Sequence, residues 1–384
     1  MKREYTLYNF DHGFKKEKTF CIGKFRISVS DEQAKNISKL EQNAKRSFVM
    51  NNDLSREMKE LPKKKGRIVE TATLRVTSTE IAESLIYKEL PKRTSIDDFV
   101  LFLSFITGRR VFLDHEIELE TPTNYFDRVV NNNFFHFPLV DIDGGLKKID
   151  ELKLSTQLYN LVHTKTVRDL PAICFYANTV VNALYERWCK NNNKSKYPAP
   201  GIKADELKER ISQILERSLV DKFKIWVNSI LSGKSYDADA IHDVVARVNI
   251  SSQPSALYKL QNFLVGLRLF PENPTKEATD RLRWTNKVRN MMVHMGDIPS
   301  DKNIGFEQRV QIATSITFLL IGIAEHYYAK EIFSINNYLV DQNAKDIREY
   351  FDSGIFRGHK VFDETYERFC ERQESEWVEN GNHV

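Results

Sequence analysis

The stretch that indicates the fold of the larger part of this chain is VRNMMVHMG, residues 288–296. It ends a helix that we expect to begin at Asn273 as the N-cap, with Pro274 in the first turn. Gly296 is expected to end this helix, because glycine adopts the left-handed conformation without steric penalty. Long amphipathic segments lie on both sides of the stretch, which predicts a helical bundle.

Apolar residues recur at steps of three or four from about residue 156 onward, the period of helices that bury one face. We expect these helices at 170–190, 204–232, 237–248, 255–270 and 306–332. The last 22 residues are acidic, and we expect a charged, solvated tail.

The first part of the chain has a different pattern. Segments 25–29, 67–76 and 110–120 alternate or carry β-branched runs, as strands do. Between them, SIDDFVLFLSFIT (residues 95–107) predicts a short apolar helix that begins at Ser95 and is ended by Gly108. The sequence therefore predicts an α+β protein: a β-rich N-terminal domain, 1–155, followed by an all-α helical bundle, 156–384, with an acidic C-terminal tail.

Composition is that of an ordinary globular protein, with 41% hydrophobic and 29% charged residues among 384. The net charge of +4 excludes a globally basic nucleic-acid coat. The four cysteines are widely spaced, which favours reduced thiols over disulfides or a metal site. The N-terminus lacks the apolar core of a signal peptide, and 310–324 is short for a membrane span. We expect a cytoplasmic protein with no membrane partner.

Arg289, Asn290 and His294 are the candidate site residues. An arginine followed five positions later by a histidine is a weak signal by itself, and Arg109 and Arg110 have the same relation to His115. That second match lies in a predicted strand and is set aside. Along a helix, Asn290 and His294 share a face, whereas Arg289 and His294 are about 140° apart. The structural alternative is a surface arginine and a histidine that favours the negative end of the helix dipole.

Over about residues 170–340 the chain resembles the HEPN domain, a helical bundle found in many prokaryotic RNA-cleaving toxins and antiviral effectors. The family's motif is an arginine, usually followed by a polar residue, and then a histidine; Arg289, Asn290 and His294 match it. The β-rich part, with 97–108 between strands, is similar to the N-terminal domain of ApeA-like HEPN antiphage proteins. This second similarity concerns architecture and one segment.

The resemblance implies a metal-independent endoribonuclease without a cofactor, acting as a toxin or in abortive infection, with Arg289, Asn290 and His294 as catalytic residues. It also implies a homodimer with a shared cleft and activation by a phage-derived trigger. RNA would be the partner, with tRNA, mRNA and rRNA all open. Three cations of the same helix, Arg281, Arg283 and Lys287, are further candidates for binding phosphates. The alternative is a non-catalytic HEPN-like module for RNA binding or dimerisation.

Chemically, such a site needs little more than proton transfer, because RNA carries its own nucleophile in the 2′-hydroxyl. Histidine exchanges its proton near neutral pH and serves as a general base or acid. The planar guanidinium of arginine holds non-bridging phosphate oxygens. The expected products are a 2′,3′-cyclic phosphate and a 5′-hydroxyl.

Other motifs are weaker. Asp141-Ile142-Asp143-Gly144 begins like a calcium loop but lacks the required glycine and the final glutamate, so we expect a turn there. Gly233-Lys234 lacks the first glycine of a phosphate-binding loop and the strand that should precede it. We interpret His163 and His326 as structural.

Overall fold

The computed structural model of the chain describes residues 3–22, 25–44, 48–50, 56–58, 68–76, 95–114, 141–167, 169–192, 255–296 and 305–362. Its contacts divide the chain into two compact units. The first unit comprises 1–181 and 269–384, and the second comprises 182–268. The two units are described separately.

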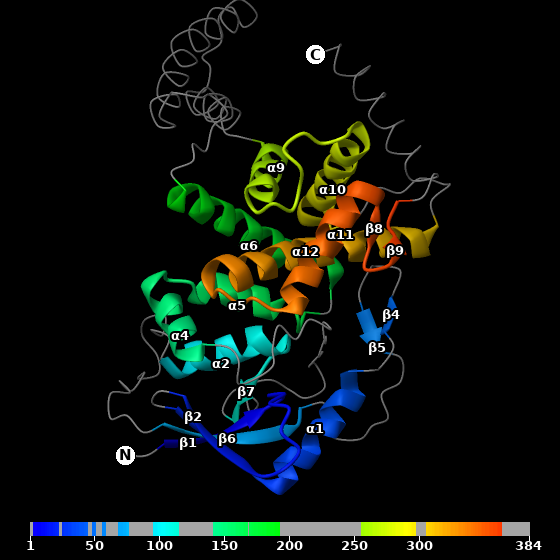
Figure 1. Cartoon of the computed structure of the whole chain (residues 1–384). Helices are drawn as coiled ribbons and strands as arrows, with labels where there is room; N and C mark the ends of the chain where they lie inside the picture. Colours follow the sequence, from blue (N-terminus) through cyan, green and yellow to red (C-terminus); the bar gives the residue numbers. More distant parts are fainter. Residues whose placement is uncertain are drawn as a thin grey trace, which may run out of the picture. The chain divides into compact units, whose positions relative to one another are not determined.

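The first unit contains a five-stranded antiparallel sheet in the order β2-β3-β6-β1-β7 (Figure 1). Its strands are β1 (Arg3–Tyr8), β2 (Lys18–Ile22), β3 (Phe25–Val29), β6 (Glu70–Val76) and β7 (Phe112–Leu113). Alternate residues of β3, namely Phe25, Ile27 and Val29, are buried, which is the period of a strand with one covered face. Two short hairpins, β4 (Phe48–Met50) with β5 (Arg56–Met58) and β8 (Ile355–Phe356) with β9 (His359–Lys360), are separate from this sheet.

Helix α1 (Asp31–Ala44) begins with a reciprocal capping interaction. The backbone N–H of Gln33 donates to the Ser30 hydroxyl at 3.2 Å, and the backbone N–H of Ser30 donates to the Gln33 side chain at 2.9 Å. The same glutamine side chain donates to Glu70 and Thr73 of β6, at 2.9 and 3.1 Å. One residue thus both begins the helix and fixes it to the sheet.

Helix α2 (Ser95–Thr107) is buried on nearly every side, as its uninterrupted apolar sequence predicts. Toward the sheet, the ring of Phe99 stacks on that of Phe25 at 4.1 Å. Toward the helices, Phe102 and Phe105 lie 4.7 and 5.4 Å from the ring of Phe333. This helix therefore joins the β-rich and helical parts of the first unit into one continuous core.

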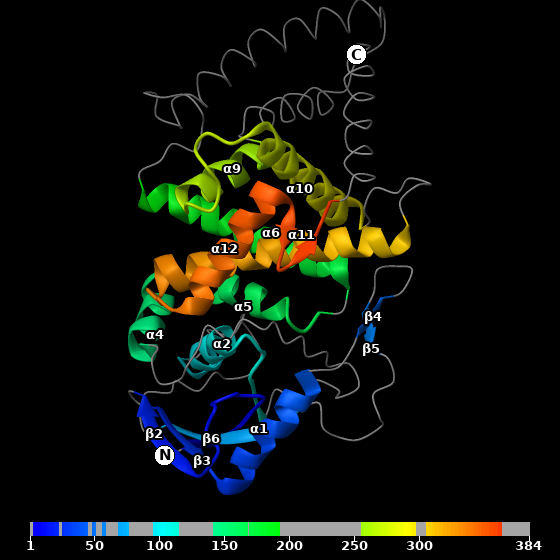
Figure 2. The same ribbon diagram turned by 45° about the vertical axis from the view of Figure 1, so that its right-hand side comes forward.

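The helical part of the first unit continues with α4 (Ile142–Glu151), α5 (Ser155–His163), the beginning of α6 (Leu170–Asn191), α10 (Lys276–Met295), α11 (Phe306–Tyr327) and α12 (Tyr338–Ser353). Helix α11 is continued by a π-helical turn, η1 (Tyr328–Ile332). Both α10 and α12 pack on α11 (Figure 2). The second unit contains the end of α6 and α9 (Ala256–Gly266), where the Lys259 ammonium lies 3.5 Å from the Glu186 carboxylate.

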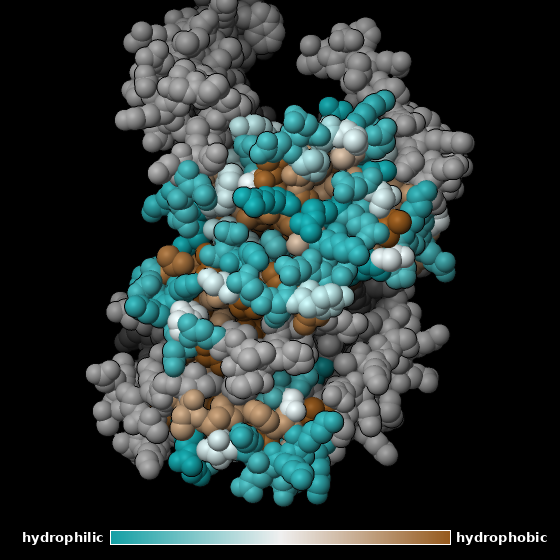
Figure 3. Space-filling view, in the orientation of Figure 1, coloured by the Kyte–Doolittle hydropathy of each residue, from teal (hydrophilic) through white to brown (hydrophobic). Residues whose placement is uncertain are grey.

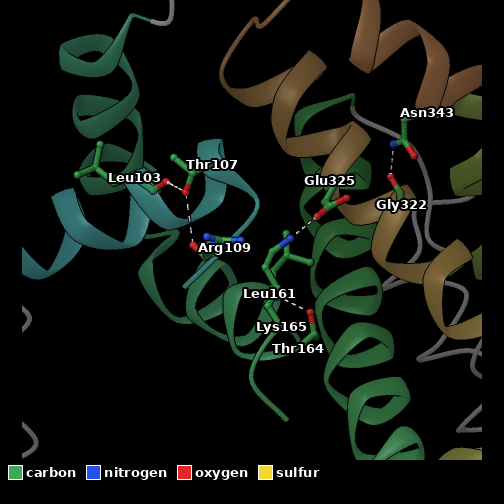
Figure 4. Close-up of polar contacts among 9 residues, drawn as sticks. All are labelled: Leu103, Thr107, Arg109, Leu161, Thr164, Lys165, Gly322, Glu325 and Asn343. Atoms are coloured by element: carbon green, nitrogen blue, oxygen red, sulfur yellow. Dashed lines mark hydrogen bonds and ion pairs between the residues drawn. The ribbon is translucent and has the colours of Figure 1, made fainter. Parts of the chain in front are cut away.

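A buried ion pair connects α5 to α11 in this core. The Lys165 ammonium, two residues after α5, donates to a Glu325 carboxylate oxygen at 2.8 Å, and both side chains are 1% exposed (Figure 4). In the same region the Asn343 amide of α12 donates to the carbonyl of Gly322 at 2.8 Å. These polar contacts fix how α5, α11 and α12 align inside an otherwise apolar interior.

The segment Phe306–Ile332 is, by length and composition alone, apolar enough to cross a membrane. However, 72% of its most apolar window is buried inside the structure, as in the central helix of a bundle. The face of the molecule seen in Figure 3 is largely hydrophilic where the residues are described. Among the described residues, the large hydrophobic side chains that are exposed are Phe175, Met295 and Tyr338.

The α+β class is confirmed, with an antiparallel sheet followed by a largely helical region. The strand expected at 25–29 and the helix expected at 95–107 are present, and the strand expected at 67–76 begins at Glu70. Of the strand expected at 110–120, the structure shows Phe112–Leu113, and 115–120 lie outside the described residues. The turn expected at Asp141 is wrong, because its side chain accepts from the backbone N–H of Gly144 at 2.9 Å and caps α4. The helices expected at 204–232 and 237–248 and the acidic tail lie outside the described residues, and the 155/156 boundary stays a prediction.

Candidate active site

Helix α10 carries all three candidate residues and is fixed at both ends. The Thr275 hydroxyl accepts from the backbone N–H of Ala278 at 3.2 Å and caps the first turn. The helix therefore begins two residues later than expected, with Thr275 as the N-cap in place of Asn273. Gly296 ends the helix with φ of 70°, as predicted.

Arg289 points from α10 into the interior and is 4% exposed. Its Nη1 donates to the Asn178 side-chain oxygen of α6 at 2.5 Å, and its Nη2 donates to the Asn286 side-chain oxygen. Its Nε is buried and has no hydrogen-bond partner among the residues that the structure describes. Burial lowers the pKa of Arg289 below its usual value, and the nearby Cys174 opposes this shift.

The acceptors that hold Arg289 are neutral amides. Among the described residues, no carboxylate hydrogen-bonds to this guanidinium or forms an ion pair with it. Buried arginines are normally paired with carboxylates, because an uncompensated charge in the interior is expensive. A buried cation with unused hydrogen-bonding capacity is therefore a site suited to an anion, and phosphate is a good match for the guanidinium geometry.

His294 lies in the last turn of α10 and is exposed to solvent, with Met295 and Gly296 exposed beside it. Asn290, one turn earlier on the same face, is half-buried. The structure thus places Asn290 and His294 on one side of the helix and directs Arg289 toward α6. Within a single chain it does not bring the guanidinium and the imidazole together.

Asn178 and Asn286 are the two residues that sequence reasoning missed. Asn286 precedes Arg289 by three positions, and residues with that spacing are neighbours on a helix. This contact could therefore have been predicted from the local sequence. Asn178 lies 111 positions before Arg289 in the chain. No local pattern identifies such a partner, since the contact exists only when α6 packs near α10.

The other cations of α10 have different surroundings. Arg281 donates to the carbonyls of Phe351 and Asp352 at 2.8 and 2.9 Å, so it completes the end of α12. Arg283 is exposed and lies 3.6 Å from Asp280, and Lys287 is half-buried. Arg283 and Lys287 are thus better placed than Arg281 to meet a phosphate chain.

The second match to the motif, Arg109 or Arg110 with His115, is not supported by the surroundings of the two arginines. Arg109 is buried, and its backbone carbonyl accepts from the Thr107 hydroxyl at 3.5 Å. The guanidinium of Arg110 lies over the rings of Phe112 and Tyr159, at 5.5 and 5.4 Å. His115 lies outside the described residues, as do Gly233 and Lys234.

The described residues contain no group of three His, Cys, Asp or Glu side chains able to hold a metal ion. Comparison of the chain with known protein families, with characterised proteins and with solved structures gives no match. The functional argument therefore depends on the geometry around α10 and on the motif that it carries.

Proposed function

We propose that this protein is a metal-independent endoribonuclease of the HEPN type, and that it acts as an antiphage or toxin effector. The observation that carries the proposal is the buried Arg289, whose guanidinium is held by the neutral amide oxygens of Asn178 and Asn286. His294 lies five residues further along the same helix and is exposed to solvent. These are the two groups that cleavage of RNA through its own 2′-hydroxyl requires.

In the proposed reaction, the 2′-oxygen forms a bond to the adjacent phosphorus and the bond from phosphorus to the 5′-oxygen breaks. One histidine accepts the proton of the 2′-hydroxyl, and a second group donates a proton to the leaving 5′-oxygen. In a homodimer whose α10 helices meet, the two copies of His294 supply the base and the acid. The Arg289 guanidinium stabilises the extra negative charge on the non-bridging oxygens.

Arg289 must turn away from Asn178 to do this, because its side chain is nearly inaccessible in the observed arrangement. A neutral amide oxygen lacks the charge–charge attraction that a carboxylate would add to its hydrogen bond with the guanidinium. Release of the guanidinium therefore costs less here than in a buried ion pair. The substrate phosphate then replaces the amide oxygens as the acceptor.

The proposal is tested by incubating the full chain with total RNA and excess EDTA, and by identifying the ends of the fragments. Wild type should yield 5′-hydroxyl and 2′,3′-cyclic phosphate ends. His294→Ala and Arg289→Ala should each lower the cleavage rate by about 10²-fold or more. His359→Ala, which removes another exposed histidine of the same unit, should cleave normally. Cleavage that needs a divalent metal, or that survives both changes, would reject the mechanism.

The burial of Arg289 also favours a second candidate, a non-catalytic RNA-binding or dimerisation module. In that case the bond from Arg289 to Asn178 only fastens α10 to α6. His294→Ala separates the candidates, because its side chain is exposed and its loss should leave the fold intact. A nuclease loses cleavage and keeps its RNA affinity, whereas a binding module has no cleavage to lose.

A further inference from the structure

Five side chains from three segments of the first unit form a continuous row, which we call the aromatic row. The Arg110 guanidinium lies 5.4 Å from the ring centre of Tyr159, and the Tyr159 ring stacks on His163 at 5.6 Å with an interplanar angle of 10°. The ring of Tyr176 meets His163 edge-on at 5.0 Å, and Phe175 meets Tyr176 at 5.9 Å. Tyr159 and His163 belong to α5, whereas Phe175 and Tyr176 belong to α6.

The row is accessible along its length rather than enclosed in the core. Arg110, Tyr159, His163 and Tyr176 are half-buried, and Phe175 is 49% exposed. Burial, followed by the charge of Arg110, lowers the pKa of His163. Its ring therefore favours the neutral form at physiological pH and adds an aromatic group, instead of a second charge, to the row.

The surrounding charges favour an anionic partner. Between residues 152 and 185 the sequence contains a single carboxylate, Asp169. That carboxylate accepts from the backbone N–H of Ala172 at 2.8 Å and so serves the first turn of α6. Arg110 supplies a cation at one end of the row. Aromatic faces with adjacent cations and few carboxylates are the composition of surfaces that bind single-stranded nucleic acid.

The aromatic row also lies close to the candidate active site, because both include residues of α6. Phe175 and Asn178 are three positions apart on α6, and residues with this spacing are neighbours on a helix surface. Asn178 accepts the hydrogen bond from Arg289. A strand lying on the aromatic row would therefore end within one helical turn of the residue that holds the arginine.

We propose that the aromatic row binds the single-stranded RNA substrate, whose unpaired bases stack on Phe175 and on the adjoining rings. This inference rests on the proposed function and adds a substrate class to it. In duplex RNA the base faces are already stacked and closed to side chains, so a duplex gains nothing from the row. The row then selects loops, ends and unpaired segments.

Binding is measured with the full chain carrying His294→Ala, so that the probe is not cleaved. The probe is a fluorescein-labelled oligouridine of about ten nucleotides, followed by fluorescence anisotropy at fixed low salt. Phe175→Leu should weaken binding about fivefold or more, because leucine keeps the apolar volume but cannot stack on a base. The matched control is Tyr338→Leu, an aromatic residue of the same unit that is 75% exposed, and it should bind normally.

Two further measurements complete the test. A 4-thiouridine version of the probe should crosslink to the peptide containing Phe175 and Tyr176, and the affinity for a labelled RNA duplex should be the same in Phe175→Leu and the parent. Equal affinities of Phe175→Leu and Tyr338→Leu for oligouridine, or crosslinks elsewhere, would overturn the inference. So would loss of self-association in Phe175→Leu with unchanged RNA affinity, which would identify a protein interface instead. Binding is read without cleavage, so this result is independent of the test of His294 and Arg289.

Discussion

The guanidinium of Arg289 is held by two neutral amides, so a single negative charge introduced beside it would strengthen its attachment. Asn178 and Asn286 present neutral oxygens to Arg289, whereas an aspartate of the same shape would present a negative charge. A hydrogen bond to an ionised acceptor is stronger by about 1 kcal/mol or more than one to a neutral acceptor. The identity of residue 178 therefore sets how readily Arg289 can be released.

We expect Asn178→Asp to lower the rate of RNA cleavage about tenfold or more, because the new ion pair retains Arg289 in the interior. The same substitution should keep or raise the thermal unfolding temperature, since it compensates a buried charge. Asn178→Ala is the control, because it removes one acceptor and adds no charge. Cleavage by Asn178→Asp at the wild-type rate would contradict the idea that Arg289 moves.

At the scale of elements, the loop between β1 and β2 is fastened to the sheet by a buried histidine. The backbone N–H of Phe14 donates to Nδ1 of His12 at 3.0 Å, so Nε2 carries the proton and donates to the carbonyl of Thr71 at 2.9 Å. The ring also contacts Phe10 and Phe14. Burial lowers the pKa of His12 to about 4, and the hydrogen bond that His12 donates to the carbonyl of Thr71 opposes this shift.

This loop should make stability depend on pH. Because the folded pKa of His12 lies below its unfolded value of about 6.5, the unfolded chain binds more protons between these values. The contribution is present above pH 6.5 and is lost as the pH falls toward 4, by roughly 3 kcal/mol in total. His12→Gln should therefore show a smaller loss of urea stability between pH 7 and pH 5 than wild type. His359→Gln, at an exposed position, should behave as wild type, and an unchanged loss in His12→Gln would contradict the assignment.

The elements that the sequence predicted correctly are those in which apolar residues form a clear pattern. The apolar run at 95–107 and the alternation at 25–29 each specify one structure. Helix α1 was missed, although Ser30 and Gln33 form the serine-to-glutamine spacing of a capping box. Asp141 was read as a turn because an aspartate followed by glycines is typical of loops, yet the same side chain caps a helix.

The candidate site was predictable only as far as α10 extends. The helix, its end at Gly296 and the positions of Arg289 and His294 along it all follow from local sequence. The direction of Arg289 does not, because it depends on Asn178, which belongs to another helix. Long-range partners of this kind are set by packing, and one sequence contains no record of them.

At the scale of the whole molecule, the interior charges near α11 form a linked set. Glu325 pairs with Lys165 at 2.8 Å. Burial lowers the pKa of Arg357, and the negative charges of Glu325 and Asp346 oppose that shift. Glu325 therefore compensates the buried Lys165 and, together with Asp346, the half-buried Arg357, two cations from distant parts of the sequence.

Glu325→Gln should lower the free energy of unfolding by about 3–5 kcal/mol, because it leaves the buried Lys165 ammonium without its counter-charge. Lys165→Met should cost less, since Arg357 still compensates Glu325. Urea denaturation of the full chain measures both. The reference is Glu151→Gln, which breaks the exposed pair with Lys147 and should cost under about 1 kcal/mol. Equal effects of Glu325→Gln and Lys165→Met would show that Arg357 has no share in the set.

The π-helical turn η1 sets the direction in which the chain leaves α11, and this direction decides which side chain packs against α2. Each additional residue in a turn rotates everything after it by about 100° about the axis. The backbone N–H of Phe333 donates to the carbonyl of Tyr328 at 2.8 Å, five residues back, so the chain leaves α11 with an altered phase. That phase aims the Phe333 ring at Phe102 and Phe105. The π-helical turn thus changes the direction of the chain at the end of α11, so that the Phe333 side chain packs against α2, the helix that covers the sheet.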